Sequence, residues 1–293
     1  MSEHGSVNES KFRPAIEEAR DARRAIPTPQ TESKSYTLAF QDPEFLLRPD
    51  LRPVRFQLEL LKPELLLDEA RIASTFVFYG SARIPEPEAA QARIEAARTP
   101  QERKVAERLA AKARYYEEAR KLARIAAQFP VNAAGCRNFV VCSGGGPSIM
   151  EAANRGAADV GAQTIGLNIV LPHEQNPNPY VTPDLSFQFH YFALRKMHFT
   201  LRARALAVFP GGFGTFDEFF ELLTLVQTGK MKPIPILLFG REFWTRVVNF
   251  DALAEEGVIS PHDLDLINWV ETAEEAWRVV DEFYGESGAD PGC

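Results

Sequence analysis

Short apolar runs alternate with longer stretches in which apolar residues recur at helical spacing. The apolar runs have the length of buried strands and lie at residues 74–79, 138–143, 163–170, 204–209 and 234–240. Helical composition or spacing marks residues 86–128, 148–157, 215–227, 242–250 and 272–284. Strands that alternate with helices in this way predict a parallel sheet covered on both faces, which is an α/β fold of the Rossmann-like, doubly wound type.

The first part of the chain has a different composition. Residues 1 to about 35 are polar and charged, and we expect them to be disordered or loosely attached. Residues 36–68 mix apolar residues with prolines and predict an extension that packs on the main domain. The predicted domains are therefore a partly disordered N-terminal extension at 1–68 and a Rossmann-like, nucleotide-binding domain at 69–293.

Glycine-rich turns follow three of the predicted strands. They are Gly80-Ser81, the run 144–146 and the segment 211–214, which contains Gly211, Gly212 and Gly214. Ligands bind at the carboxyl ends of the strands in such sheets, and glycines let the backbone approach a phosphate at a helix N-terminus. No turn has the dinucleotide or P-loop spacing, and a tight turn without ligand explains any one of them equally well. Three glycine-rich turns at one edge of the sheet favour a nucleotide-binding site.

Composition and charge narrow the class of protein. The chain is 45% hydrophobic and 25% charged, with a net charge of −7, which argues against a nucleic-acid partner. No apolar run reaches the roughly 18 residues of a membrane helix, and the N-terminus lacks the apolar core of a secretory signal. Three cysteines without metal-like spacing predict reduced thiols in a cytoplasmic protein, and no metal site.

The charged residues near the glycine turns have structural explanations as well as functional ones. Thr215 and Glu218 fit the Thr-x-x-Glu capping box, so Glu218 could be a helix cap. Ser148 and Glu151 fit the serine form of the same pattern. The pair Arg195-Lys196 could belong to a solvated helix face. An anionic ligand nearby would give these residues a second role, and the sequence pattern leaves both explanations open.

Three segments resemble the Lonely Guy family, whose members were long labelled lysine decarboxylases. "PGGFGTFDE" matches its P-G-G-x-G-T-x-x-E signature, "RK" precedes it at the expected separation, and "SGGGPSIMEAANRGA" resembles its other glycine-rich segment. The resemblance covers roughly residues 70–285. It implies a Rossmann-like homodimer, or a hexamer built from dimers, that hydrolyses nucleoside 5′-monophosphates such as AMP or cytokinin nucleotides to free base and ribose 5-phosphate. Residues 1–68 depart from the short members, and "GGGPSIMEA" lacks the G-L-M-G ending seen in many members. These two departures leave the base and the assembly size open.

The family resemblance also implies the site. Glu218 and Arg195 are the expected catalytic residues, and hydrolysis needs no cofactor. The expected substrate-binding residues are those of the glycine turns and their neighbours: Gly80, Ser81, Gly144, Gly145, Gly146, Met150, Lys196, Gly211, Gly212, Gly214 and Thr215. The alternative is a non-catalytic nucleotide sensor or a molybdenum-cofactor carrier, which would use the same turns without needing Glu218 and Arg195.

Overall fold

The computed structural model describes residues 13–23, 25–172 and 176–287, and divides the chain into two compact units, Met1–Glu59 and Leu60–Cys293. The first unit contains α1 (Ala15–Ala22) and α2 (Pro43–Leu46), and the long helix α3 (Arg52–Glu69) begins in it. The expected disorder of the N-terminus falls partly on residues 1–12, which lie outside the described residues. The expected domain boundary after residue 68 stays a prediction.

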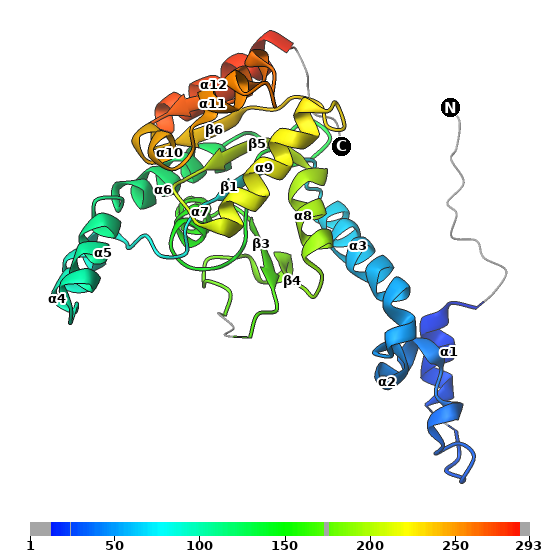
Figure 1. Ribbon diagram of the computed structural model, residues 1–293. Coiled ribbons are helices and arrows are strands. Elements are labelled where there is room, and N and C mark those ends of the chain that lie inside the picture. Colours follow the sequence, from blue (N-terminus) through cyan, green and yellow to red (C-terminus); the bar gives the residue numbers. More distant parts are fainter. Residues whose placement is uncertain (1–12, 24, 173–175, 288–293) are drawn as a thin grey trace. The chain divides into compact units, whose positions relative to one another are not determined.

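The second unit contains a seven-stranded parallel sheet with the strand order β4-β3-β2-β1-β5-β6-β7 (Figure 1). The strands are β1 (Thr75–Tyr79), β2 (Val140–Ser143), β3 (Thr164–Ile169), β4 (Ser186–Phe189), β5 (Ala203–Val208), β6 (Ile236–Phe239) and β7 (Asn268–Val270). The predicted α/β class is confirmed. The apolar runs predicted β1, β2, β3, β5 and β6. They did not reveal β4, in which polar and apolar residues alternate, or β7, which has only three residues.

Helices occupy most of the connections between these strands, and one more helix follows the last strand. In the connections lie α4 (Pro87–Glu95), α5 (Pro100–Ala110), α6 (Arg114–Ala127), α7 (Ile149–Ala158), α8 (Phe192–Leu201), α9 (Phe213–Gln227), α10 (Arg241–Val247) and α11 (Phe250–Glu255), and α12 (Ala273–Ser287) follows β7. Sequence signals explain several of their ends. Thr99 caps α5 by accepting a hydrogen bond from the amide of Glu102, with Pro100 at the first helical position.

The two faces of the sheet carry different helices. Apolar side chains of α6, α7 and α12 form one buried core with Phe76 and Phe78 of β1. Gly156 lets α7 approach α6 closely, because a Cβ atom there would collide with the carbonyl of Arg120. The opposite face carries α8 and α9, which lie side by side in front of the sheet in Figure 1 and are joined by ion pairs. This second face supplies the charged residues of the candidate site.

The strand order reverses between β1 and β5. Connections from β1 lead outward through β2, β3 and β4, and the chain then returns across α8 to β5 on the other side of β1. A backbone hydrogen bond of 3.1 Å from Ser81 to the carbonyl of Pro210 joins the loops that leave the two strands. Ligands of doubly wound sheets bind in the crevice at such a reversal.

Two sequence predictions concern the cysteines and the membrane. Cys142 is a free thiol buried on β2, as expected, but Cys136 is disulfide-bonded, so the prediction of reduced thiols is wrong for that residue. Among the described residues, no helix combines the length and the apolar character that crossing a membrane requires.

Candidate active site

The turn after β5 leads directly into α9 and leaves that helix without a side-chain cap. Gly212 is the N-cap, and no side chain accepts from the first amides of α9. A Cβ atom on Gly211 would collide with the hydroxyl of Thr215, whereas Gly212 and Gly214 face open space. The first N–H groups of α9 and the Thr215 hydroxyl can therefore meet an anion together.

The capping-box explanation of Glu218 is wrong. Because α9 begins at Phe213, Thr215 is its third residue and Glu218 lies in the second turn, so neither caps the helix. The same pattern at Ser148 is also no cap, since its hydroxyl donates to the carbonyl of Ile84 at 2.5 Å instead of accepting from α7. In α9 a glycine, which carries no capping side chain, occupies the N-cap position.

Glu218 faces Arg195 of the neighbouring helix α8. The Glu218 Oε1 and Arg195 Nη1 atoms are 3.5 Å apart, and the two side chains are 15% and 12% exposed. A shorter bond of 2.6 Å from Arg195 Nε to the carbonyl of Leu167 fixes the guanidinium over the end of β3. The guanidinium also stacks on the Phe199 ring, with 5.1 Å between Cζ and the ring centroid.

The glycine run after β2 reaches the same guanidinium. A Cβ atom on Gly144 would lie 2.5 Å from Arg195 Nη2 and 2.8 Å from the sulfur of Met150. The structure thus brings together four predicted residues, Gly144, Met150, Arg195 and Glu218, from three separate segments. Gly80 lies on the neighbouring strand end, where a Cβ atom would be 2.6 Å from Ile149 of α7.

Buried asparagines hold the glycine run in shape. Gly145, with φ of +70°, donates its amide to the Ser143 hydroxyl at 3.0 Å. Asn178 donates from its side chain to the carbonyl of Gly146 at 3.0 Å and to Asn154 Oδ1 at 2.9 Å. Asn154 also accepts from the Ser143 hydroxyl at 2.7 Å. The sequence analysis missed both asparagines, although Asn154 stands out as an amide inside an otherwise apolar helix face.

Burial changes the acidity of the central carboxylate. It raises the pKa of Glu218 from the ordinary 4.5 to about 7, because the charged form loses solvation. The positive charge of Arg195 opposes this shift, and the negative charge of Asp217 adds to it. A pKa raised toward neutrality suits a group that takes up or releases a proton during a reaction.

Lys196 pairs with two acidic neighbours of Glu218 on α9. Its ammonium lies 3.2 Å from Asp217 Oδ1 and 3.0 Å from Glu221 Oε2. In this position Lys196 ties α8 to α9. Its role as a substrate-binding residue stays a prediction.

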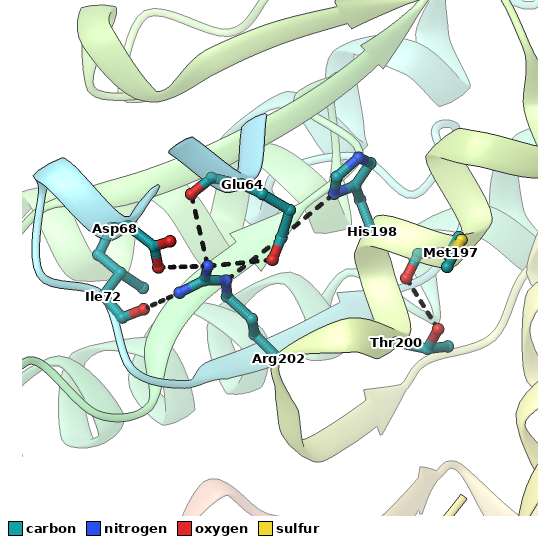
Figure 2. Close-up of polar contacts among 7 residues, drawn as sticks. All are labelled: Glu64, Asp68, Ile72, Met197, His198, Thr200 and Arg202. Atoms are coloured by element: carbon teal, nitrogen blue, oxygen red, sulfur yellow. Dashed lines mark hydrogen bonds and ion pairs between the residues drawn. The ribbon is translucent and has the colours of Figure 1, made fainter. Parts of the chain in front are cut away.

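The C-terminal end of α8 is anchored to α3, as Figure 2 shows. Arg202 donates to Asp68 Oδ1 at 2.6 Å, to Glu64 Oε2 at 3.1 Å and to the carbonyl of Ile72 at 2.5 Å. The ring of His198 on α8 faces the same Glu64, with Nδ1 3.6 Å from Oε1. These contacts fix the helix that carries Arg195. In the described part of the chain, no group of three or more His, Cys, Asp or Glu residues could hold a metal ion.

Together these features define a Rossmann-like α/β protein whose candidate site pairs a buried glutamate with an arginine beside glycine turns. A family model described as "Possible lysine decarboxylase" matches residues 150–280. The cytokinin riboside 5′-monophosphate phosphoribohydrolase LOG3 of Arabidopsis thaliana is 27% identical over 151 residues, which are 50% of this chain and 69% of that protein. The resemblance to the Lonely Guy family is thereby confirmed.

A second kind of relative is a nucleosidase. The pyrimidine/purine nucleotide 5′-monophosphate nucleosidase of Escherichia coli K12 is 31% identical over 124 residues, which are 37% of this chain and 26% of that protein. Among solved structures, the molybdenum cofactor carrier protein of Chlamydomonas reinhardtii has a TM-score of 0.41 and 15% identity, covering 72% of this chain and 99% of the carrier.

Proposed function

We propose that the protein hydrolyses the N-glycosidic bond of nucleoside 5′-monophosphates, releasing the free base and ribose 5-phosphate. The observation that carries this proposal is the carboxylate of Glu218, which has a pKa of about 7, lies opposite Arg195 and follows an uncapped helix N-terminus. The printed activities of the similar phosphoribohydrolases and nucleosidases support the same reaction.

The reaction makes a specific demand on the carboxylate. As the bond between C1′ and the base nitrogen breaks, its electron pair leaves with the base and positive charge develops on the ribose. Water attacks C1′ and must lose a proton. The Glu218 carboxylate stabilises the developing charge and accepts that proton, and the leaving base takes up a proton in turn.

Arg195 has two roles in this scheme. Its bond to the Leu167 carbonyl keeps the guanidinium in place while Glu218 changes its protonation state. Its positive charge lowers the pKa of Glu218 relative to burial alone, so part of the population is ionised and able to act as a base. A guanidinium at this position can also orient the substrate or stabilise the departing base.

The 5′-phosphate is the natural ligand of the turn at Gly211–Thr215. Amides at the start of α9 and the Thr215 hydroxyl provide donors, and the helix dipole favours the negative charge. Binding energy from this non-reacting group can position the sugar against Glu218. We expect the protein to hydrolyse AMP and to act far less on adenosine.

The proposal also covers the assembly, the cellular location and the cofactor requirement of the enzyme. We expect a homodimer or a hexamer built from dimers that works in the cytoplasm without a cofactor, on a small nucleotide and not on nucleic acid. A non-catalytic carrier would need no glutamate with a raised pKa opposite an arginine, so the Glu218–Arg195 pair favours hydrolysis over that alternative.

Product analysis tests the proposal directly. The full chain is incubated with a panel of nucleoside 5′-monophosphates and the matching nucleosides, and free base is measured by chromatography. We expect adenine from AMP and far less from adenosine. Comparable kcat/KM values for AMP and adenosine would contradict the role of the phosphate, and no base from any nucleotide would contradict the activity.

A further inference from the structure

Tyr79 is the last residue of β1, at the position where the strand order reverses. Side chains alternate between the faces of a strand, so Phe76 and Phe78 join the core beneath α6 and α7, while neighbouring Tyr79 points to the other face. There its ring packs edge-on against Phe199 of α8, with 5.0 Å between the ring centroids. Arg195 stacks on the same Phe199 ring.

The hydroxyl of Tyr79 has no hydrogen-bond partner among the described residues, although Tyr79 is only 5% exposed. The Tyr79 hydroxyl is not one of the unpartnered side-chain atoms that are completely enclosed by protein, so it retains some contact with solvent. A phenylalanine would pack against Phe199 equally well and would avoid an unpaired polar group in a buried place. The hydroxyl therefore points to a ligand.

The charges around this side chain are those of the candidate site. Glu218, Arg195 and Glu221 all act electrostatically on the Tyr79 hydroxyl. Burial raises its pKa well above the ordinary 10, and the Glu218 charge raises it further. Tyr79 consequently stays protonated throughout the working pH range, as a hydrogen-bond donor within electrostatic range of the Glu218 carboxylate.

We propose that the Tyr79 hydroxyl contacts the substrate and donates a hydrogen bond to the 2′-hydroxyl of the ribose. This inference rests on the proposed function, which places the C1′ carbon against Glu218. The 2′-hydroxyl is carried by the carbon next to C1′, so a donor beside Glu218 lies at the correct part of the sugar. Tyr79 then selects ribonucleotides over 2′-deoxyribonucleotides.

The test compares Tyr79→Phe with the unaltered protein on AMP and on 2′-deoxy-AMP. Removing a hydrogen bond between neutral groups costs about 1 kcal/mol, so we expect kcat/KM on AMP to fall by roughly fivefold to tenfold. On 2′-deoxy-AMP the two proteins should have similar kcat/KM values, because the partner hydroxyl is missing. The preference for AMP over 2′-deoxy-AMP should therefore largely disappear in the variant.

Tyr284→Phe is the matched control. The Tyr284 hydroxyl donates to the carbonyl of Arg204 at 2.6 Å, away from the site, so its loss should affect thermal stability and leave the substrate preference unchanged. An equal fall on both substrates in Tyr79→Phe would assign Tyr79 a structural role and overturn the inference, as would unaltered kcat/KM on AMP. Measurements on the unaltered protein distinguish failure of this inference from failure of the proposed function. If the unaltered protein releases no base from AMP, the proposed function is wrong and the inference falls with it.

Discussion

Glu218 and Arg195 form a loose pair, in which the arginine is held mainly by other groups. Their closest atoms are 3.5 Å apart, beyond the usual 2.7–3.2 Å of a strong hydrogen bond, whereas Arg195 bonds to the Leu167 carbonyl at 2.6 Å. The guanidinium can therefore keep its position when Glu218 gains or loses a proton. Such independence is what a proton-transferring carboxylate needs from its neighbour.

Glu218→Gln should abolish most of the activity while the fold persists. The amide keeps the size of the side chain but can neither accept the proton of water nor carry a negative charge. We expect kcat on AMP to fall by about 10²-fold or more, as is typical for the loss of a general acid–base group. Glu221→Gln is the control, since Glu221 lies on the same helix and pairs with Lys196. Near-normal hydrolysis by Glu218→Gln would refute the catalytic assignment.

The pH dependence should report the same carboxylate. If Glu218 acts as a base, kcat/KM rises as the pH increases through about 7 and then levels off. Arg195→Gln removes the charge that lowers the pKa of Glu218, so the rise should move to higher pH. The pH profile of kcat/KM is measured for the unaltered protein, for Arg195→Gln and for Glu218→Gln. The residual activity of Glu218→Gln should lack the rise. An unchanged profile in Arg195→Gln would disprove the electrostatic coupling.

Ionisation of Glu218 should lower the thermal stability of the protein. Its pKa in the folded state, about 7, is above the ordinary 4.5, so its favourable contribution is complete at low pH and is lost as the pH rises through 7. Glu218→Gln should therefore melt several degrees above the unaltered protein at pH 8, with little difference near pH 4. Calorimetry at both pH values measures this, and a lower Tm for the variant at pH 8 would contradict it.

Gly144→Ala should damage the site through Arg195. The added Cβ atom would lie 2.5 Å from Nη2, so the guanidinium or the turn must shift. We expect kcat/KM on AMP to fall by roughly tenfold or more, because small misplacements of a catalytic group are costly. Gly285→Ala is the control, since nothing lies near the added atom in α12. Equal activity of the two variants would show that Gly144 does not position Arg195.

The assembly prediction is tested by light scattering. The family resemblance implies a homodimer or a hexamer built from dimers, so the measured mass should be about two or six times the chain mass of 32.8 kDa. The measurement should span a range of protein concentrations. A monomer throughout that range would count against the prediction.

The main elements of the fold could be predicted from the sequence because central parallel strands are buried on both faces. β1 and β5 are therefore nearly continuous apolar runs, whereas β7 has only three residues, Asn268–Val270, and gives no such signal. In the site, the signature at Gly211–Glu218 identified the central residues. The capping pattern misled because a local spacing cannot show where a helix begins when glycine is its N-cap. Asn178 and Tyr79 could not be found, since their roles depend on contacts between distant segments.

The bonds of Arg202 to α3 bear on where a shortened version of this protein can begin. A chain that starts at residue 69 would lack both Glu64 and Asp68, the two carboxylates that pair with the Arg202 side chain, which is itself 13% exposed. Arg202 would then be a largely buried cation without a counter-charge, and such a loss is strongly destabilising. A chain that starts at Leu60 retains both carboxylates. Residues 60–68 belong to no strand of the sheet. A shortened protein must nevertheless keep them, because their two carboxylates hold the end of the helix that carries Arg195.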